Sequence, residues 1–245
     1  MNVIDNHIHV GWYTNGYNSP REVWNSIIEA GVDEFAVSST SVCAELYDTV
    51  IDEIRELISL GGESVHPILW VTPLMMKTQG VKYMLQSGIK WQGVKMHWDA
   101  HKDWCNELDL VNKVVGIARS LNVPILLHTG ETAKSMAENF KDLCRFNQDV
   151  KFVLAHGRPL EQTLSILKLY PNTYMDAAFM PIENVQQLVN EGLINRILFG
   201  TDMPINKVYY TKISNSQYIK NCLSEIRNNL SEDEFKQIMR NQVYI

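Results

Sequence analysis

Two histidines near the start of the chain are separated by a single residue, in the order His7-Ile8-His9. The residues before them are mostly apolar, as in a buried β-strand. Alternate side chains of a strand point to the same face, so both imidazoles would point the same way while Ile8 points away. That arrangement suits two nitrogen ligands of one metal ion. Two surface histidines at the start of a loop are the alternative, which the pair alone does not exclude.

Four further apolar runs end in side chains that can bind a metal or transfer a proton. The ionisable residues at these ends are Lys95 with His97, His128, His156 and Asp202. Each has an ordinary alternative, because a lysine stem can reach to the surface and a histidine can bond to backbone in a core. Five apolar runs that end in this way in one chain are a far more specific sign of a functional site than any one of them alone.

These residues together suggest metal-dependent chemistry. Three neutral histidines and a carboxylate form a ligand set that suits zinc. A water bound to such an ion loses a proton near neutral pH. Asp202 could both bind the ion and accept that proton, and His156 could polarise a carbonyl or carry a proton. Lys95 would contact a substrate anion or, once carboxylated, bridge two metals, because a bare lysine is costly inside a protein.

The apolar runs recur through the whole chain and alternate with segments of helical spacing. One such segment has Leu160, Leu164 and Leu167, and the pair Ser231 and Glu234 forms a capping-box pattern that predicts a last helix through Met239. The runs read as buried strands and cover residues 3–9, 34–39, 66–72, 93–98, 124–129, 151–156, 173–177 and 196–201.

Strands that alternate with helices indicate an α/β fold with a parallel sheet. Eight such units in 245 residues predict one (β/α)8 TIM barrel, a single domain over residues 1–245. An open doubly wound sheet is the alternative, and no GxGxxG follows the first strand to support its dinucleotide-binding form. In a closed barrel the eighth strand lies beside the first, which would bring Asp202 next to His7 and His9.

Composition and charge narrow the class of partner. The net charge is −6 and no run of Lys or Arg occurs, so we expect neither a nucleic acid nor a membrane as partner. The first residues have no basic n-region and no apolar h-region, so we do not expect a signal peptide. No apolar stretch reaches the roughly 20 residues of a membrane span. The four cysteines have no CxxC spacing and are expected to be reduced thiols. These features predict a cytoplasmic protein.

The ordered motifs resemble those of the amidohydrolase-related family, in the branch that includes the aminocarboxymuconate-semialdehyde and resorcylate-type decarboxylases. The resemblance covers nearly the whole chain, and its motifs are specific as an ordered set but weak singly. The residues that carry it are Asp5-Asn6-His7-Ile8-His9, Gly93-Val94-Lys95-Met96-His97, Pro124-Ile125-Leu126-Leu127-His128-Thr129-Gly130, Ala155-His156-Gly157 and Gly200-Thr201-Asp202-Met203-Pro204.

The resemblance implies one divalent metal ion, usually zinc. Its ligands by that pattern are His7, His9, His128 and Asp202. His156 matches a histidine that is catalytic in some members, and we expect Asp202 and His156 to be the catalytic pair. The branch usually has an unmodified lysine at the position of Lys95, so a second metal with carboxylated Lys95 is less favoured. Decarboxylating relatives are often dimers, which makes a homodimer a further expectation.

The short loops expected after the strands imply a small pocket and a small-molecule substrate. Residues expected at its mouth, and predicted to bind substrate, are Lys95, His97, Trp98, Glu131 and Arg158. Arg158 and Lys95 are the best candidates for gripping a carboxylate, since Arg offers a planar fork of donors.

Three functions fit these residues. The first is a hydrolase that attacks a small, carboxylate-bearing amide, ester or lactone with a metal-activated water. The second is a nonoxidative decarboxylase, which would use the same residues. The third is an inert barrel that binds a metal or ligand without turnover. The sequence does not separate hydrolysis from decarboxylation, and the breadth of the family favours the hydrolase.

Overall fold

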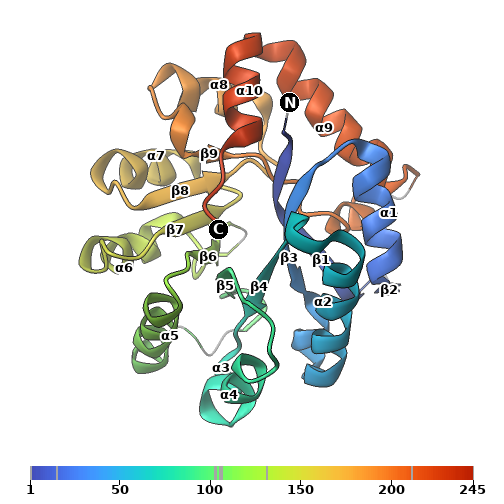
Figure 1. The fold of residues 1–245 in the computed structure, drawn as a ribbon. Coiled ribbons are helices and arrows are strands. Elements are labelled where there is room, and N and C mark those ends of the chain that lie inside the picture. Colours follow the sequence, from blue (N-terminus) through green and yellow to red (C-terminus); the bar gives the residue numbers. More distant parts are fainter. Residues whose placement is uncertain are drawn as a thin grey trace.

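The computed structural model describes residues 2–14, 16–101, 104, 107–130, 132–210 and 212–244. Across these residues a sheet with the strand order β2-β1-β3-β4-β5-β6-β7-β8-β9 curls into a barrel (Figure 1). The parallel strands are β1 Ile4–Tyr13, β3 Glu34–Ser39, β4 Val65–Trp70, β5 Gly93–Met96, β6 Ile125–His128, β7 Phe152–Ala155, β8 Thr173–Asp176 and β9 Ile197–Leu198.

The eight parallel strands occur where the eight apolar runs predicted them, and the barrel fold is confirmed. One strand was not predicted. This is β2, Gly16–Asn18, which pairs antiparallel with the end of β1 and extends it beyond the barrel. The residues of β2 show no alternation of apolar and polar side chains, which is the pattern by which a strand is recognised in a sequence. The sequence therefore did not predict β2.

The barrel closes between β1 and the segment that follows β9. Asp202 N donates to His7 O at 2.7 Å, and His9 N donates to Met203 O at 2.7 Å. Backbone hydrogen bonds therefore join the first strand to residues almost two hundred positions later, and they place Asp202 next to the two histidines.

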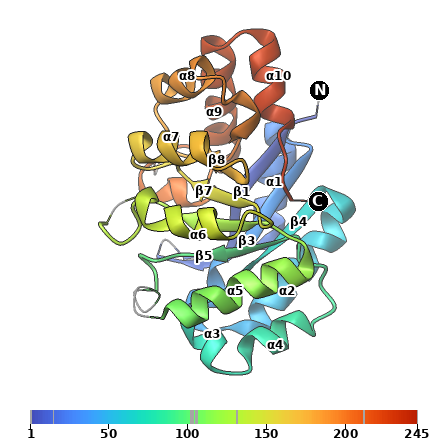
Figure 2. The ribbon, with the colours of Figure 1, turned by 90° about the vertical axis from the view of Figure 1, so that its left-hand side faces the viewer.

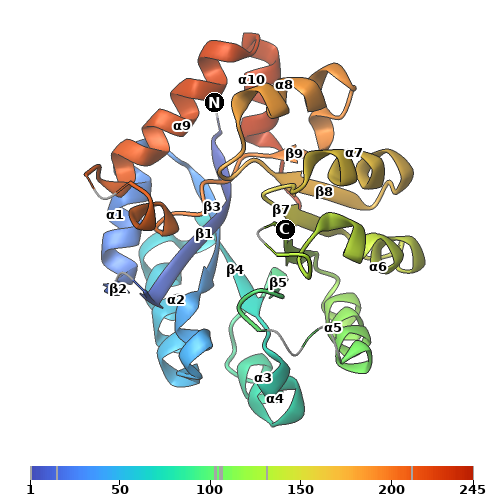
Figure 3. The ribbon, with the colours of Figure 1, turned by 180° about the vertical axis from the view of Figure 1, so that it is seen from behind.

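Helices cover the outside of the barrel (Figures 2 and 3). The predicted last helix is present as α10, which Ser231 and Glu234 cap reciprocally. In the described parts of the chain, no helix has the length and apolar character that a membrane crossing requires. The helices are α1 Pro20–Ala30, α2 Tyr47–Gly61, α3 Pro73–Lys77, α4 Gly80–Leu85, α5 Leu108–Leu121, α6 Lys141–Phe146, α7 Leu160–Leu169, α8 Ile182–Asn190, α9 Asn215–Asn229 and α10 Glu232–Arg240.

Two apolar clusters form the core. The larger one lies between the strands and the helices, where alternate strand residues such as Val37, Leu127 and Leu154 meet the helical apolar faces. The smaller one comes from the opposite strand faces and fills the barrel interior; it consists of Ala36, Ile68, Leu126, Val153, Ala155 and Leu198 together with Val243 and Tyr244. The polar site lies at the C-terminal ends of the same inward-facing rows.

Candidate metal centre

The end of β1 presents two imidazoles to the barrel axis. His7 Nδ1 lies 3.0 Å from Asp176 Oδ2, and His9 Nδ1 lies 3.2 Å from the carbonyl oxygen of Ser38. Because each acceptor holds the proton on Nδ1, each Nε2 keeps a lone pair. Burial, and then the charge of Lys95, lowers the pKa of both histidines well below the ordinary value, so both are neutral.

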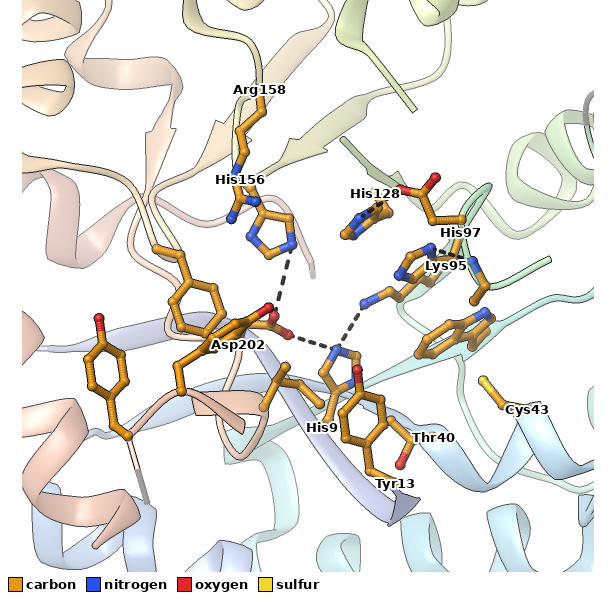
Figure 4. A pocket seen from close by; sticks show the side chains of 17 residues that line it. His9, Tyr13, Thr40, Cys43, Lys95, His97, His128, His156, Arg158 and Asp202 are labelled. Carbon is orange, nitrogen blue, oxygen red and sulfur yellow. Dashed lines mark hydrogen bonds and ion pairs between the residues drawn. The ribbon is translucent and has the colours of Figure 1, made fainter. Parts of the chain in front are cut away.

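Asp202 brings a carboxylate to the same two nitrogens, and Figure 4 shows its contact with His9. Its Oδ1 lies 3.3 Å from His7 Nε2 and 3.0 Å from His9 Nε2. The ligand atoms of these three residues all lie within 4.8 Å of one another, and all three residues are buried. The backbone of Asp202 has φ 56°, a left-handed conformation that Asp and Asn tolerate better than most residues.

Lys95 supplies a cationic contact to this cluster. Its Nζ lies 2.9 Å from the Nε2 of both His7 and His9, and 4.6 Å from the centre of the Trp70 ring. Burial lowers the pKa of Lys95 to about 8, although Asp202 and Asp176 oppose this. The lone pairs of both imidazoles therefore point to a place where a positive charge is accommodated. Two neutral nitrogen donors and a carboxylate form a set that fits a divalent ion such as zinc.

His128 lies in the same pocket, and its contacts there include His97 and Asp99. Its ring stacks on His97 with centroids 3.6 Å apart, and its Nε2 lies 3.5 Å from Asp99 Oδ2. Ser135 Oγ donates to Asp99 at 2.6 Å, and Thr132 also bonds to it. Hydrogen bonds, that of His128 first, hold the pKa of Asp99 well below its usual range. Of the described residues, His128 belongs to neither of the clusters with metal-binding geometry.

His156 stands beside Asp202 on the opposite side of the pocket. Its Nδ1 lies 3.2 Å from the carbonyl oxygen of Ala178, and its Nε2 lies 3.9 Å from Asp202 Oδ2. Burial lowers the pKa of His156 to about 3, so the ring is neutral. With the proton on Nδ1, the Nε2 lone pair faces the carboxylate.

Asp176, at the end of β8, is the residue of this centre that the sequence reasoning missed. Beyond its contact with His7, its Oδ1 accepts from the backbone N–H groups of His156 and Ala178, both at 3.1 Å. The seventh apolar run, residues 173–177, ends Asp176-Ala177, so a strand-end rule that also considers the residue before the last would have found Asp176. Asp99 was also missed, and it follows the strand end, where alternation no longer holds.

The centre lies at the floor of a cavity of about 720 Å³ at the C-terminal ends of the strands. Three of the predicted substrate-binding residues, Lys95, His97 and Arg158, line it. Trp98 does not. It packs against Trp104 and Phe140 outside the barrel, with ring centroids 5.9 Å and 4.8 Å away, since it continues the outward-facing side of β5. Glu131 lies outside the described residues.

Three solved structures share this fold over nearly their whole length. An amidohydrolase from Burkholderia multivorans with bound zinc has a TM-score of 0.70 and 11% identity, covering 98% of this chain and 96% of the other. A probable 2-pyrone-4,6-dicarboxylic acid hydrolase from Acinetobacter baumannii, with citric acid bound, has a TM-score of 0.69 and 13% identity. The match covers 98% of this chain and 97% of the other. The 5-carboxyvanillate decarboxylase from Sphingomonas paucimobilis has a TM-score of 0.63 and 10% identity. The match covers 98% of this chain and 99% of the other.

Comparison of the sequence with protein-family models identifies a family, which similarity of fold alone does not. No protein of curated function matches the chain. The family model described as Amidohydrolase matches residues 76–241, which is more than half of the chain and includes the positions of Lys95, His128, His156 and Asp202. The chain thus belongs to the amidohydrolase family, as its ordered motifs predicted.

Proposed function

We propose that this protein is a metal-dependent hydrolase that acts on a small amide, ester or lactone bearing a carboxylate. The observation that carries the proposal is the convergence of His7 Nε2, His9 Nε2 and an Asp202 oxygen at the floor of an open pocket. Such a centre leaves room for water and substrate, as a catalytic metal site needs.

His7, His9 and Asp202 would hold the ion, and His128 is the fourth ligand that we propose, because it lines the same pocket. A bound divalent ion would polarise a substrate carbonyl and increase the acidity of water. Asp176 and Ser38 keep the two imidazoles in the tautomer that offers Nε2. We propose a single ion, with Lys95 unmodified.

Asp202 would accept the proton of the attacking water on Oδ2, the oxygen that faces His156. His156 would then take the proton at Nε2, because its Nδ1 proton is held by Ala178 O. The imidazolium formed in this way can pass the Nε2 proton to the leaving group, as a general acid does, and His156 then returns to its neutral form. The low pKa of about 3 favours transfer away from His156.

The pocket walls support a substrate with a carboxylate and an apolar part. Arg158 and Lys95 supply cations for the carboxylate, while Trp70, Phe179 and Tyr209 supply apolar surface. A neighbour of similar fold is named as a hydrolase of 2-pyrone-4,6-dicarboxylic acid. That compound is a cyclic ester with two carboxylates, so carboxylated lactones are the first substrates to try.

A metal and turnover assay tests the proposal. Protein purified without chelator should contain about one zinc per chain, and about two would instead indicate the binuclear site with carboxylated Lys95. It should then hydrolyse a member of a panel of carboxylated lactones, esters and amides, lose that activity to a chelator and regain it with zinc. The same panel includes aromatic and muconate acids. Carbon dioxide release without any hydrolysis would replace the hydrolase by the decarboxylase, and no metal uptake would leave an inert barrel.

A further inference from the structure

The ring of His97 is held by the backbone of the loop that follows β5. The backbone N–H of Ala100 donates to His97 Nδ1 at 3.2 Å. Because a backbone N–H can only donate, Nδ1 must carry a lone pair. The proton of the imidazole is then on the other ring nitrogen, Nε2. His97 is therefore fixed in the tautomer that has its N–H on the ring nitrogen farther from the backbone.

This tautomer is the opposite of the one at His7, His9 and His156. In those three rings a carboxylate or a carbonyl oxygen holds the proton on Nδ1, so that Nε2 is an acceptor. An Nε2 acceptor suits a metal ion or the uptake of a proton. The Nε2 of His97 is a donor instead, so in this form it does not bind a metal, and it suits a hydrogen bond to an oxygen.

Two aromatic neighbours fix the place of the His97 ring. Trp70 ends β4 and His128 ends β6, and β5 lies between these two strands in the sheet. The ring of His97 is stacked with that of Trp70, with centroids 5.4 Å apart and planes at 9°. It is also stacked with that of His128, with centroids 3.6 Å apart and planes at 14°. The two stacks and the bond from Ala100 hold the ring in one orientation, so its Nε2–H is a preorganised donor.

The His97 side chain forms part of the wall of the cavity above the metal centre. It lines that cavity together with His9, Lys95 and His128, and Figure 4 shows it beside His128. His97 is partly exposed, and its hydrogen bond to a described residue is the one from Ala100 at Nδ1. A donor in this position can be satisfied by an oxygen of a bound molecule.

We propose that the Nε2–H of His97 donates a hydrogen bond to an oxygen of the substrate, either of its carboxylate or of its carbonyl group. The inference rests on the proposed function, and it names the kind of atom that this wall of the pocket recognises. A ligand oxygen accepts the bond, whereas an ammonium group at the same place would meet a second donor. His97 thus favours acids and carbonyl compounds over amines as ligands.

NMR of the metal-free protein, labelled with nitrogen-15 at histidine, tests the tautomer and the contact. The ring nitrogens are detected through the carbon-bound ring protons, and the His97 signals are those absent from His97→Gln. We expect Nε2 to be protonated and Nδ1 not. The probes are isophthalate, a planar dicarboxylate, and 2-pyrone, a lactone without a carboxylate. The Nε2 signal should shift with isophthalate alone if a carboxylate is the acceptor, and with 2-pyrone if the carbonyl group is.

Two variants separate the hydrogen bond from the packing of the ring. His97→Gln keeps an N–H donor and removes the ring, whereas His97→Phe keeps a ring and removes the donor. The rate is measured on the zinc-loaded protein with the lactone found in the panel. We expect kcat/KM to fall by roughly tenfold in His97→Phe, as the loss of one hydrogen bond to a ligand oxygen would cause, and by less in His97→Gln.

Three results would overturn the proposal. A His97 proton on Nδ1 would remove the donor, and an Nε2 signal that neither probe shifts would show that no ligand oxygen reaches it. A larger loss of rate in His97→Gln than in His97→Phe would mean that the ring acts by stacking alone. If the protein takes up no zinc or turns over no substrate, the proposed function fails. The tautomer and the two titrations of the metal-free protein still decide whether His97 donates to a ligand oxygen.

Discussion

The Nδ1 nitrogen of His7 lies 3.0 Å from Oδ2 of Asp176, and both side chains are almost completely excluded from solvent. The other oxygen of Asp176 accepts the backbone N–H of His156. One carboxylate therefore orients a proposed metal ligand and fixes the backbone of a proposed catalytic histidine.

Asp176→Asn should weaken zinc binding by roughly 10- to 100-fold, because the amide no longer holds the His7 proton on Nδ1 with a full negative charge. Chelator competition measures the affinity. Asp109→Asn on the exposed side of α5 is the matched control and should bind zinc like the wild type. Unchanged affinity in Asp176→Asn would mean that His7 is not a ligand through Nε2.

Asp202→Asn should keep the fold and remove activity. Asn tolerates the left-handed backbone at this position, with φ 56°, so Tm should change little. Loss of the proton acceptor should lower kcat by roughly 10²- to 10⁴-fold. The rate is measured on the lactone found in the panel, with Asp233→Asn on α10 as control. Retained turnover would exclude Asp202 as the base.

His156→Asn should lower kcat by a similar roughly 10²- to 10⁴-fold while leaving zinc content unchanged. Asn is chosen because residue 156 has φ 67°. Plasma mass spectrometry gives zinc per chain and steady-state kinetics give kcat. A drop to half of the wild-type metal content would show instead that His156 is a ligand in a binuclear site.

Arg158→Ala should lower kcat/KM for carboxylated lactones by roughly 10- to 150-fold, the effect of losing one hydrogen bond to a charged group. An uncharged analogue of the same lactone should lose much less. Arg158→Lys should recover only part of the loss, because an ammonium group does not offer a planar fork. Equal losses on charged and uncharged substrates would contradict the proposed role of Arg158.

Glu53→Gln should make stability less dependent on pH. The Glu53 carboxyl is buried and accepts hydrogen bonds from Ser39 at 2.5 Å and Ser41 at 2.8 Å. Burial raises its pKa above the ordinary 4.5, despite these bonds. The folded state therefore binds this proton more tightly than the unfolded state, so the stabilisation is complete below pH 4.5 and is lost as pH rises through the folded pKa.

Thermal unfolding between pH 4 and pH 8 measures this effect. The Tm of Glu53→Gln relative to the wild type should increase as the pH rises. Glu63→Gln changes an exposed carboxyl and should show a constant difference. A Tm difference for Glu53→Gln that falls with rising pH would reverse the sign of the argument.

The sequence by itself determined the barrel and the strand ends that carry its chemistry. Apolar runs and helical spacing are local properties, so they predicted eight strands and the last helix. Alternation within β1 put His7 and His9 on one face, and the order of the strands put Asp202 beside them. Each of these predictions depends only on regular geometry inside an element or on barrel closure.

Tertiary structure decided which partners the side chains at the strand ends contact. His128 is the last residue of β6, and packing turns it toward Asp99 and His97. The place of Tyr244 depends on where α10 releases the chain and on the space at Gly93. These outcomes depend on loop conformation and on contacts between distant segments, which no local pattern of residues encodes.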